Sequence, residues 1–424
     1  MTTRLGGLLL DTTPLRLDRD YRWLWSGQAV TGIGNQITRL ALPYQVYALT
    51  GSTAAIAALT TFQLIPILLF ALGGGSLADV VDRRKLLLAT QLGLAGCSLA
   101  LVLLSTTGEP PLPALFAVAF LAAGLFSIDQ PARGASIPRL VPPERLPAAL
   151  ALNQLNFQLG SIVGPAIGGI LIATVGLTGA YVVDLLTFAA SIVALLVIGP
   201  LPPLATATRP GLAAIREGLG YARRHRPIFG SFVIDLIAMI FAMPTALFPV
   251  LALDVFKVGP AGLGLLAAAP AAGAFVGAVF SGWVGRVWRV GRAVVFSVIG
   301  WGIAITAFGV TALIATPAAF VVGLVMLAIA GAADMLSAVF RNQIVQLGAP
   351  DELRGRVTSI HTLVVTAGPR IGDIESALLA TLIGPGLTVI VGGLLCLGGV
   401  AVMGRWLPEL GEHVIRRVPR TATP

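Results

Sequence analysis

The stretch Gly160-Ser-Ile-Val-Gly-Pro-Ala-Ile-Gly-Gly169 is echoed by Gly368-Pro-Arg-Ile-Gly-Asp373 in the second part of the 424-residue chain. Two more pairs of segments repeat in the same order, each 207 positions apart: Leu140–Leu146 with Leu347–Leu353, and Gly75–Lys85 with Gly282–Arg292. Three matches in one order indicate an internal duplication. Parallel repeats of this size are typical of membrane transporters.

The composition is that of a membrane protein. Hydrophobic residues make up 56% of the chain and charged residues only 11%, and the mean hydropathy is +0.90. A single soluble core would leave much of this apolar surface in water, so we expect the bilayer to be the solvent. The two cysteines, Cys97 and Cys396, lie in apolar runs, which favours packing over a disulfide or a metal site. No cofactor and no metal are predicted.

Twelve apolar stretches of about 20 residues are long enough to cross the hydrocarbon core. The first six predicted helices cover residues 22–48, 54–78, 86–105, 112–130, 147–175 and 178–198. The second six cover residues 228–253, 260–284, 293–315, 317–340, 357–382 and 386–405. The predicted fold is an all-α polytopic membrane protein with two six-helix halves, residues 1–198 and 228–424. They are joined by a cytoplasmic linker at 199–227, which contains an amphipathic helix.

The basic residues predict the orientation in the membrane. All but three of the 28 Lys and Arg residues fall in segments on one side of the predicted topology, the exceptions being Arg39, Lys257 and Arg370. Positive residues are retained in cytoplasmic loops, so both termini are predicted to be cytoplasmic in a multi-pass protein of the cell membrane. The same distribution explains the pI of about 10.5. Because the charges are spread over short loops and form no single patch, no nucleic acid is predicted as a partner.

Two motifs resemble those of the major facilitator superfamily. The first is a cytoplasmic loop motif made of Gly75, Asp79, Asp82, Arg83, Arg84 and Lys85. The resemblance implies that this loop latches the halves in one state of the transporter, the alternative being a basic loop that only fixes topology. The second resembles the fifth-helix motif of the antiporters and consists of Gly160, Gly164, Pro165, Gly168 and Gly169. It implies export over uptake, the alternative being ordinary close packing of small residues.

Several shorter segments narrow the resemblance to the branch that contains bacterial enterobactin exporters and related multidrug pumps. They are Ala41-Leu-Pro43, Leu49-Thr-Gly-Ser52, Asp129-Gln-Pro-Ala-Arg133 and Pro138-Arg-Leu-Val141. The resemblance implies a siderophore or an amphipathic drug as substrate. The chain departs from the drug/proton antiporter pattern in the fourth helix, where Leu112–Ile128 contains no arginine.

Charges inside predicted spans are costly and mark ion paths or structural pairs. Arg370 and Asp373 share a helix face because they are three residues apart, and Glu375 lies nearby. Arg39 lies at a similar depth in the first helix, so a gate is predicted in which it pairs with Asp373 or Glu375. Asp235 is the alternative proton carrier. A structural role is favoured for three further carboxylates: Asp129, near Arg133; Asp334, near Arg341; and Asp184.

Weakly polar side chains on the first, second and fifth helices are candidates to line a solute cavity: Gln28, Asn35, Gln36, Gln63, Asn153, Asn156 and Gln158. A surface that mixes such groups with apolar ones suits an amphipathic solute. His361 corresponds to Asn153 in the other repeat and is a weaker candidate for the same vestibule.

These features favour a secondary active exporter that moves a small amphipathic solute by alternating access, with proton antiport as the expected coupling. An uptake symporter or a facilitator on the same fold is the alternative. A membrane enzyme would need a nucleophile with its base or a metal cluster, and none is visible in the sequence. A receptor or scaffold would be expected to show an added soluble domain or no intramembrane charges. No phosphate-binding loop for ATP occurs. The expected partners are the solute, protons and membrane lipid, and the expected state is a monomer.

Overall fold

The computed structural model describes residues 11–71, 81–202 and 212–414, and no β-strand occurs in these ranges. The chain forms two compact units. Unit 1 comprises residues 1–209 together with 246–268, and unit 2 comprises residues 210–245 together with 269–424. A short segment of the second repeat therefore packs as part of the unit that contains the first repeat.

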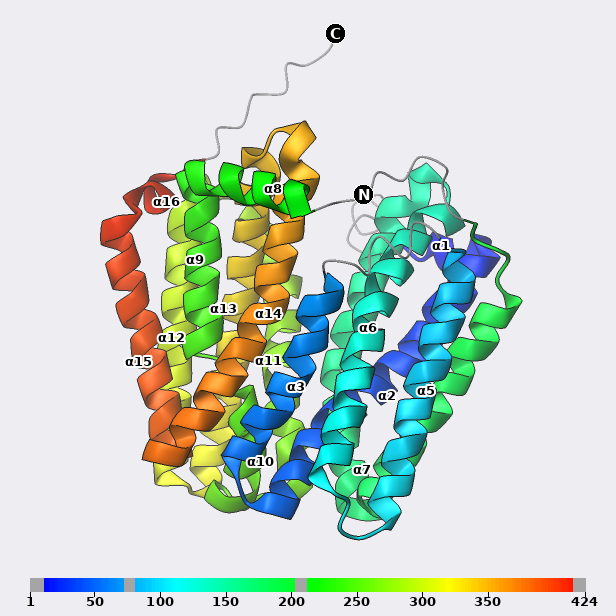
Figure 1. Cartoon of the computed structure of the whole chain (residues 1–424). Coiled ribbons are helices and arrows are strands. Elements are labelled where there is room, and N and C mark those ends of the chain that lie inside the picture. Colours follow the sequence, from blue (N-terminus) through cyan, green and yellow to red (C-terminus); the bar gives the residue numbers. More distant parts are fainter. Residues whose placement is uncertain (1–10, 72–80, 203–211, 415–424) are drawn as a thin grey trace, which may run out of the picture. The chain divides into compact units, whose positions relative to one another are not determined.

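Unit 1 is a bundle of long helices (Figure 1). Within it α2 packs on α7, α3 packs on α6, and α5 packs on both α6 and α7. The helices are α1 (Thr13–Leu17), α2 (Arg19–Thr50), α3 (Thr53–Ala71), α5 (Arg83–Thr106), α6 (Leu112–Leu140) and α7 (Leu146–Val197).

Helix α7 consists of two helices that meet at Gly176. The φ of this residue is 74° and its ψ is −179°, a conformation that glycine adopts without the steric cost of a side chain. The predicted helices 147–175 and 178–198 meet at the same place. At 52 residues, α7 therefore contributes two membrane-spanning helices.

The predicted single helix at 228–253 is interrupted after Phe241, although Arg226–Val255 remains one apolar stretch long enough to cross a membrane. Helix α9 (Arg226–Phe241) ends there, and the chain continues as a 3-10 turn (Thr245–Leu247), the short α10 (Phe248–Val250) and a π-helical turn (Leu251–Val255). Two prolines, Pro244 and Pro249, lie in this stretch. Proline lacks the backbone N–H that a continuous helix needs at that position, which accounts for the interruption.

Unit 2 contains α9 and a second bundle (Figure 1). Its amphipathic helix α8 lies across one end of the bundle and contacts α9 and α14. The exposed pair Glu217–Arg356, at 2.7 Å, joins α8 to α14. The remaining helices are α8 (Leu212–Arg224), α11 (Gly259–Val279, shared with unit 1), α12 (Val290–Ile314), α13 (Pro317–Gly348), α14 (Asp351–Ile383), α15 (Pro385–Trp406) and α16 (Pro408–Glu412).

Nine helical stretches in the described ranges are long and apolar enough to cross a membrane. One of them, Pro143–Val197, contains the two helices joined at Gly176. Helices α2 and α14, with 32 and 33 residues, are long enough to span but contain polar and charged residues. The chain is thus an all-α polytopic membrane protein, and its helices are consistent with twelve crossings.

The duplication is visible in the packing of the two fifth-helix motifs. A Cβ added at Gly164 would lie 3.0 Å from the carbonyl oxygen of Ile33 on α2. A Cβ at Gly372 would lie 2.8 Å from the carbonyl oxygen of Ile240 on α9. Ile33 and Ile240 are 207 positions apart, and the two glycines are 208 apart. In each repeat the motif glycine therefore brings an equivalent pair of helices into backbone contact, α7 with α2 in the first and α14 with α9 in the second.

Candidate solute pocket and buried charge clusters

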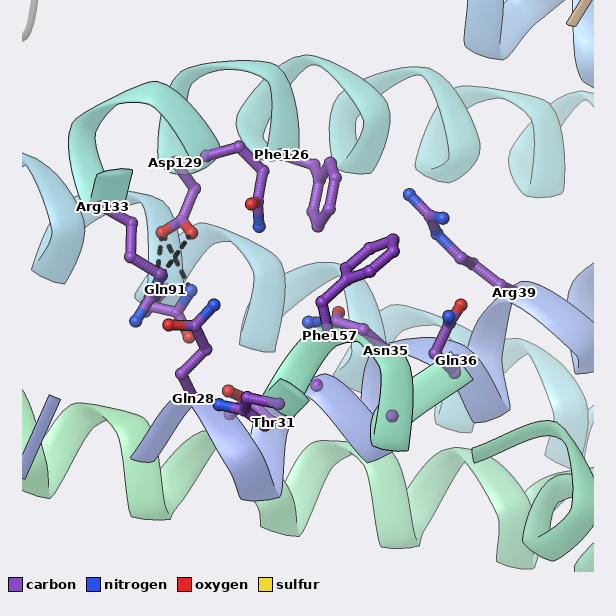
Figure 2. A pocket seen from close by; sticks show the side chains of 14 residues that line it. Gln28, Thr31, Asn35, Gln36, Arg39, Gln91, Phe126, Asp129, Arg133 and Phe157 are labelled. Atoms are coloured by element: carbon purple, nitrogen blue, oxygen red, sulfur yellow. Dashed lines mark hydrogen bonds and ion pairs between the residues drawn. The ribbon is translucent and has the colours of Figure 1, made fainter. Parts of the chain in front are cut away.

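A pocket lies inside unit 1 between α2, α5, α6 and α7 (Figure 2). Its walls combine amide groups, two phenylalanine rings, two arginines and one carboxylate. The lining residues are Gln28, Thr31, Gly32, Asn35, Gln36, Arg39, Gln91, Phe126, Asp129, Gln130, Arg133, Asn156, Phe157 and Gly160.

One end of the pocket is a buried ion pair. Asp129 accepts hydrogen bonds from Arg133 Nε (3.0 Å), Thr90 Oγ1 (2.9 Å) and Gln91 Nε2 (2.9 Å). Both charged side chains are nearly inaccessible to solvent. Charges in such a setting require a partner, and the i,i+4 spacing on α6 supplies it. The structure therefore contains the Asp129–Arg133 contact that the sequence predicts.

The other end of the pocket combines a guanidinium with aromatic rings. Figure 2 shows Phe126 and Phe157 between the Asp129 cluster and Arg39. The Cζ of Arg39 lies 4.9 Å from the centroid of the Phe126 ring, within the range of a cation–π contact. Phe157 is 59% exposed, and Gln36 donates a hydrogen bond to Ser161. This end can contact an apolar or aromatic group and a polar group together.

Four of the seven predicted cavity residues line the pocket, and three do not. Gln28, Asn35, Gln36 and Asn156 belong to its wall, and the amide of Asn156 also donates to the carbonyl of Trp25 at 3.3 Å. The three outside it are Gln63, Asn153 and Gln158.

Sequence reasoning missed the lining residues on α5 and α6. Gln91, Phe126 and Gln130 belong to the pocket because α5 and α6 line it together with α2 and α7, a relationship that helix periodicity alone does not contain. The signal that could have found them is Asp129, a charged residue inside the predicted membrane span 112–130.

The glycine motif of α7 packs against two different helices. A Cβ at Gly164 would lie 2.4 Å from the Cβ of Gln36 on α2. A Cβ at Gly169 would lie 2.5 Å from the carbonyl oxygen of Pro260 and 2.9 Å from the Cα of Gly264, both on α11. Gly168 also faces α2, and Gly160 faces it at an ordinary contact distance. Small residues at these places permit the close approach of α7 to both neighbours.

The loop motif lies partly outside the described residues, which do not include Gly75 and Asp79. Asp82 caps α5 by accepting hydrogen bonds from the backbone N–H groups of Arg84 and Lys85. The Arg83 guanidinium donates to the carbonyl of Ala135 on α6 at 2.8 Å. The Arg84 guanidinium donates to the carbonyls of Leu195 and Leu196 on α7. This part of the motif ties α5 to the ends of α6 and α7 within unit 1.

In unit 2, Asp235 on α9 has a partner that lies far away in sequence. Arg341 Nη1 on α13 donates to Asp235, and Arg341 Nη2 lies 3.5 Å from Asp334 Oδ1. The Asp235 and Arg341 side chains are buried, whereas the Asp334 side chain is 39% exposed. His361 on α14 stacks on Phe232, with ring centroids 5.7 Å apart.

Two further intramembrane carboxylates, Asp373 and Asp184, are also held by neighbours. Thr245 donates a hydrogen bond to Asp373, and Arg370 Nη1 lies 4.0 Å from Asp373 Oδ2. Asp184 accepts hydrogen bonds from Thr38 (2.6 Å) and Ser98 (2.9 Å). Glu375 is half-buried on α14. The predicted pairing of Arg39 with Asp373 or Glu375 joins residues of different units and stays a prediction.

No cluster of three or more His, Cys, Asp or Glu side chains suited to a metal ion occurs among the described residues.

Comparisons with known proteins assign the chain to a family. Residues 11–418 match the family described as transmembrane secretion effector. The chain is 28% identical over 404 residues to the enterobactin exporter EntS of Citrobacter koseri, covering 93% of this chain and 92% of that protein. It is 25% identical over 386 residues to macrolide efflux protein A of Streptococcus pyogenes, covering 90% and 94%.

Solved structures share the fold. A bacterial homologue of the iron transporter ferroportin in an inward-facing state superposes with a TM-score of 0.73 at 16% identity, covering 92% of this chain and 99% of that one. A bacterial homologue of the lysosomal transporter Spinster superposes with a TM-score of 0.69 at 15% identity, covering 96% and 100%. The chain belongs to the transmembrane secretion effector family of major facilitator transporters, and is a membrane transporter and not an enzyme.

Proposed function

We propose that the protein is a secondary active exporter that moves a small amphipathic solute out of the cytoplasm by alternating access, in exchange for protons. The pocket of unit 1 carries the proposal, because its amide groups and the rings of Phe126 and Phe157 lie on long helices of the membrane domain. Such a lining can bind a solute that has an apolar body and a few polar groups. The two similar proteins named as an enterobactin exporter and a macrolide efflux protein support export of a siderophore or a drug-like compound.

Coupling is proposed to use carboxylates inside the membrane domain. A charge in the hydrocarbon region costs several kcal/mol unless it is paired or hydrated, about 2.5–3.5 kcal/mol for an aspartate at a helix centre. Asp373 is held by Thr245 and lies near Arg370. In the gate that the sequence predicts, a proton on Asp373 or Glu375 would weaken the attraction to Arg39. One elementary charge crossing 100 mV supplies about 2.3 kcal/mol.

The proposed location is the cell membrane, with both termini in the cytoplasm and the protein acting as a monomer in contact with lipid. The distribution of basic residues supports this orientation.

The pocket is tested with purified protein in proteoliposomes, screened against a panel of amphipathic cations and siderophores. For any solute that the intact protein moves, we expect Gln28→Ala and Phe157→Ala to raise KM about tenfold, because a tenfold change corresponds to about 1.4 kcal/mol of contact energy. The matched control is Gln154→Ala, which lies on the same helix as Phe157 but outside the pocket. Equal KM values for all four proteins would overturn the assignment of the pocket.

Proton coupling through α14 is tested in the same vesicles with an imposed pH gradient. If the predicted gate operates, Asp373→Asn or Glu375→Gln abolishes the response to the gradient while equilibrating transport continues. A gradient response that survives both substitutions removes α14 as the coupling site.

A further inference from the structure

A polar cluster in unit 2 is buried but incompletely satisfied. It is formed by Asp235 on α9, Ser337 and Arg341 on α13, and His361 on α14, whose exposed fractions are 1%, 1%, 3% and 7%. Four of its side-chain atoms have no hydrogen-bond partner within the described residues: Asp235 Oδ2, Ser337 Oγ, Arg341 Nε and His361 Nε2. A buried polar atom left unsatisfied costs about 1–3 kcal/mol, so such a concentration needs an explanation.

The equivalent cluster of unit 1 contains a fully paired carboxylate, although Arg133 Nη1 and Gln91 Oε1 have no partner within the described residues. Arg133 and Arg341 lie 208 positions apart, as do Asp129 and Ser337. In unit 1 the carboxylate lies on the same helix as its arginine, and both of its oxygens accept hydrogen bonds. In unit 2 a serine takes that position, and the carboxylate is supplied from another helix by Asp235, which keeps one oxygen unpartnered.

The guanidinium of Arg341 in unit 2 lies close to two carboxylates whose exposed fractions differ. Arg341 donates to the buried Asp235 and lies 3.5 Å from Asp334, whose side chain is 39% exposed. A guanidinium has five N–H donors in a fixed fork, so a small movement transfers its strongest contact from one carboxylate to the other. The contact between Arg341 and Asp235 is therefore adjustable.

Within the described residues, the charged groups on helices packed against α9 come chiefly from α13 and α14. Helix α13 contributes Asp334 and Arg341, and α14 contributes His361, which lies within electrostatic reach of Arg341. Helix α14 also carries Arg370, Asp373 and Glu375, in the part where Gly372 packs on Met239 and Ile240 of α9. Helices α12 and α15, which also pack on α9, have their charged residues at their ends, Arg292 and Arg405. Helices α8 and α16 contact α9 as well. Arg226, the first residue of α9, lies 3.9 Å from Glu409 on α16.

We infer that Asp235 binds the coupling proton and that Arg341 and His361 position it, an inference that rests on the proton coupling proposed above. A proton from water adds to a carboxylate oxygen of Asp235 and gives the neutral acid. Arg341 keeps its own proton and shifts its pairing to Asp334. The new O–H of Asp235 is a donor, and the cluster already contains two acceptors without partners, Ser337 Oγ and His361 Nε2. Loss of the proton to water reverses these steps.

The protonation itself is tested by infrared difference spectroscopy of the purified protein between acidic and alkaline pH. The expected result is a protonated-carboxyl band that titrates in the intact protein and is missing in Asp235→Asn. The matched control is Asp184→Asn, which removes a buried carboxylate of unit 1 held by two hydroxyl groups. A spectrum that is unchanged by Asp235→Asn overturns the inference.

Transport measurements separate a coupling role from a structural one. With a solute that the intact protein exports, Asp235→Asn is expected to keep solute exchange across the membrane but to lose accumulation driven by a pH gradient, whereas Asp184→Asn keeps both. Arg341→Lys is expected to retain gradient-driven transport with a shifted pH profile. If Asp235→Asn does not fold, the double variant Asp235→Asn with Arg341→Gln removes both charges and takes its place.

The outcomes distinguish the two proposals. Gradient-driven transport that survives in Asp235→Asn but is lost in Asp373→Asn overturns this inference and leaves proton-coupled export standing. If solute transport by the intact protein does not depend on the pH gradient, the proposed coupling itself is contradicted.

Discussion

Tyr47 and Asp254 occupy equivalent positions in the two repeats, 207 residues apart, and the hydroxyl of Tyr47 donates a hydrogen bond to the carboxylate of Asp254. Tyr47 lies in the last turn of α2, and Asp254 lies in the π-helical turn that follows α10. Both residues belong to unit 1. The hydrogen bond therefore fastens a segment of the second repeat to the first helix of the first repeat.

Removal of this hydroxyl is expected to weaken unit 1. A hydrogen bond to a charged group contributes about 1.5–3 kcal/mol, and Tyr47→Phe deletes it while keeping the ring. We expect a lower Tm in a thermal unfolding assay in detergent. Tyr44→Phe, on the same helix, is the control. Equal Tm values for the two variants would show that the contact contributes nothing, and a double-mutant cycle with Asp254→Asn isolates the pairwise energy.

The two glycines Gly160 and Gly164 are expected to differ in their tolerance of alanine. A Cβ at Gly164 would lie 2.4 Å from the Gln36 side chain, whereas a Cβ at Gly160 would lie 3.6 Å from the nearest atoms of Gly32. Overpacking typically costs about 1–3 kcal/mol. Gly164→Ala should therefore lower the Tm, and Gly160→Ala should leave it nearly unchanged. Similar losses in the two variants would contradict the packing described for α7.

The predicted orientation can be tested by cysteine labelling in intact cells. The two native cysteines, Cys97 and Cys396, are buried and should give little background. We expect an impermeant thiol reagent to label Gly108→Cys, in the turn between α5 and α6, and to leave Gly411→Cys unlabelled until the membrane is opened. The reverse pattern would invert the topology.

His413, next to α16 at the end of unit 2, predicts a pH effect on stability. Burial lowers the pKa of His413 below its usual 6.5, and the charge of His225 lowers it further. The folded protein therefore binds fewer protons at this site than the unfolded chain does. The resulting stability is present above about pH 6.5 and is lost as the pH falls toward the lowered pKa. We expect the Tm of the intact protein to fall more steeply on acidification than that of His413→Gln.

Much of the fold follows from hydropathy and small-residue motifs. The apolar stretches place the long helices, because about 20 apolar residues must cross the hydrocarbon core whatever their neighbours are. The boundary near Gly176 follows from the same pattern. The interruption after Phe241 was missed, although Pro244 and Pro249 are visible in the sequence, because an apolar run hides a broken helix when only hydropathy is counted.

The candidate sites were less predictable because they depend on which helices face one another. The pair formed by Arg133 and Asp129 is local, so its i,i+4 spacing revealed it. The contact of Arg341 with Asp235 joins residues 106 positions apart, and no local pattern indicates it. For the same reason, Gln63 was predicted to line the cavity from its polarity alone and does not line the pocket of unit 1.

The most direct test of the account is net solute movement in proteoliposomes whose protein has one known orientation, with the pH gradient imposed first in one direction and then in the other. The account predicts that the solute accumulates against its own concentration gradient on the acidic side, and that Phe157→Ala slows this movement. Accumulation on the alkaline side would identify a symporter. Movement that stops at equal concentrations in both gradients would identify a facilitator, and either result would contradict proton-driven export.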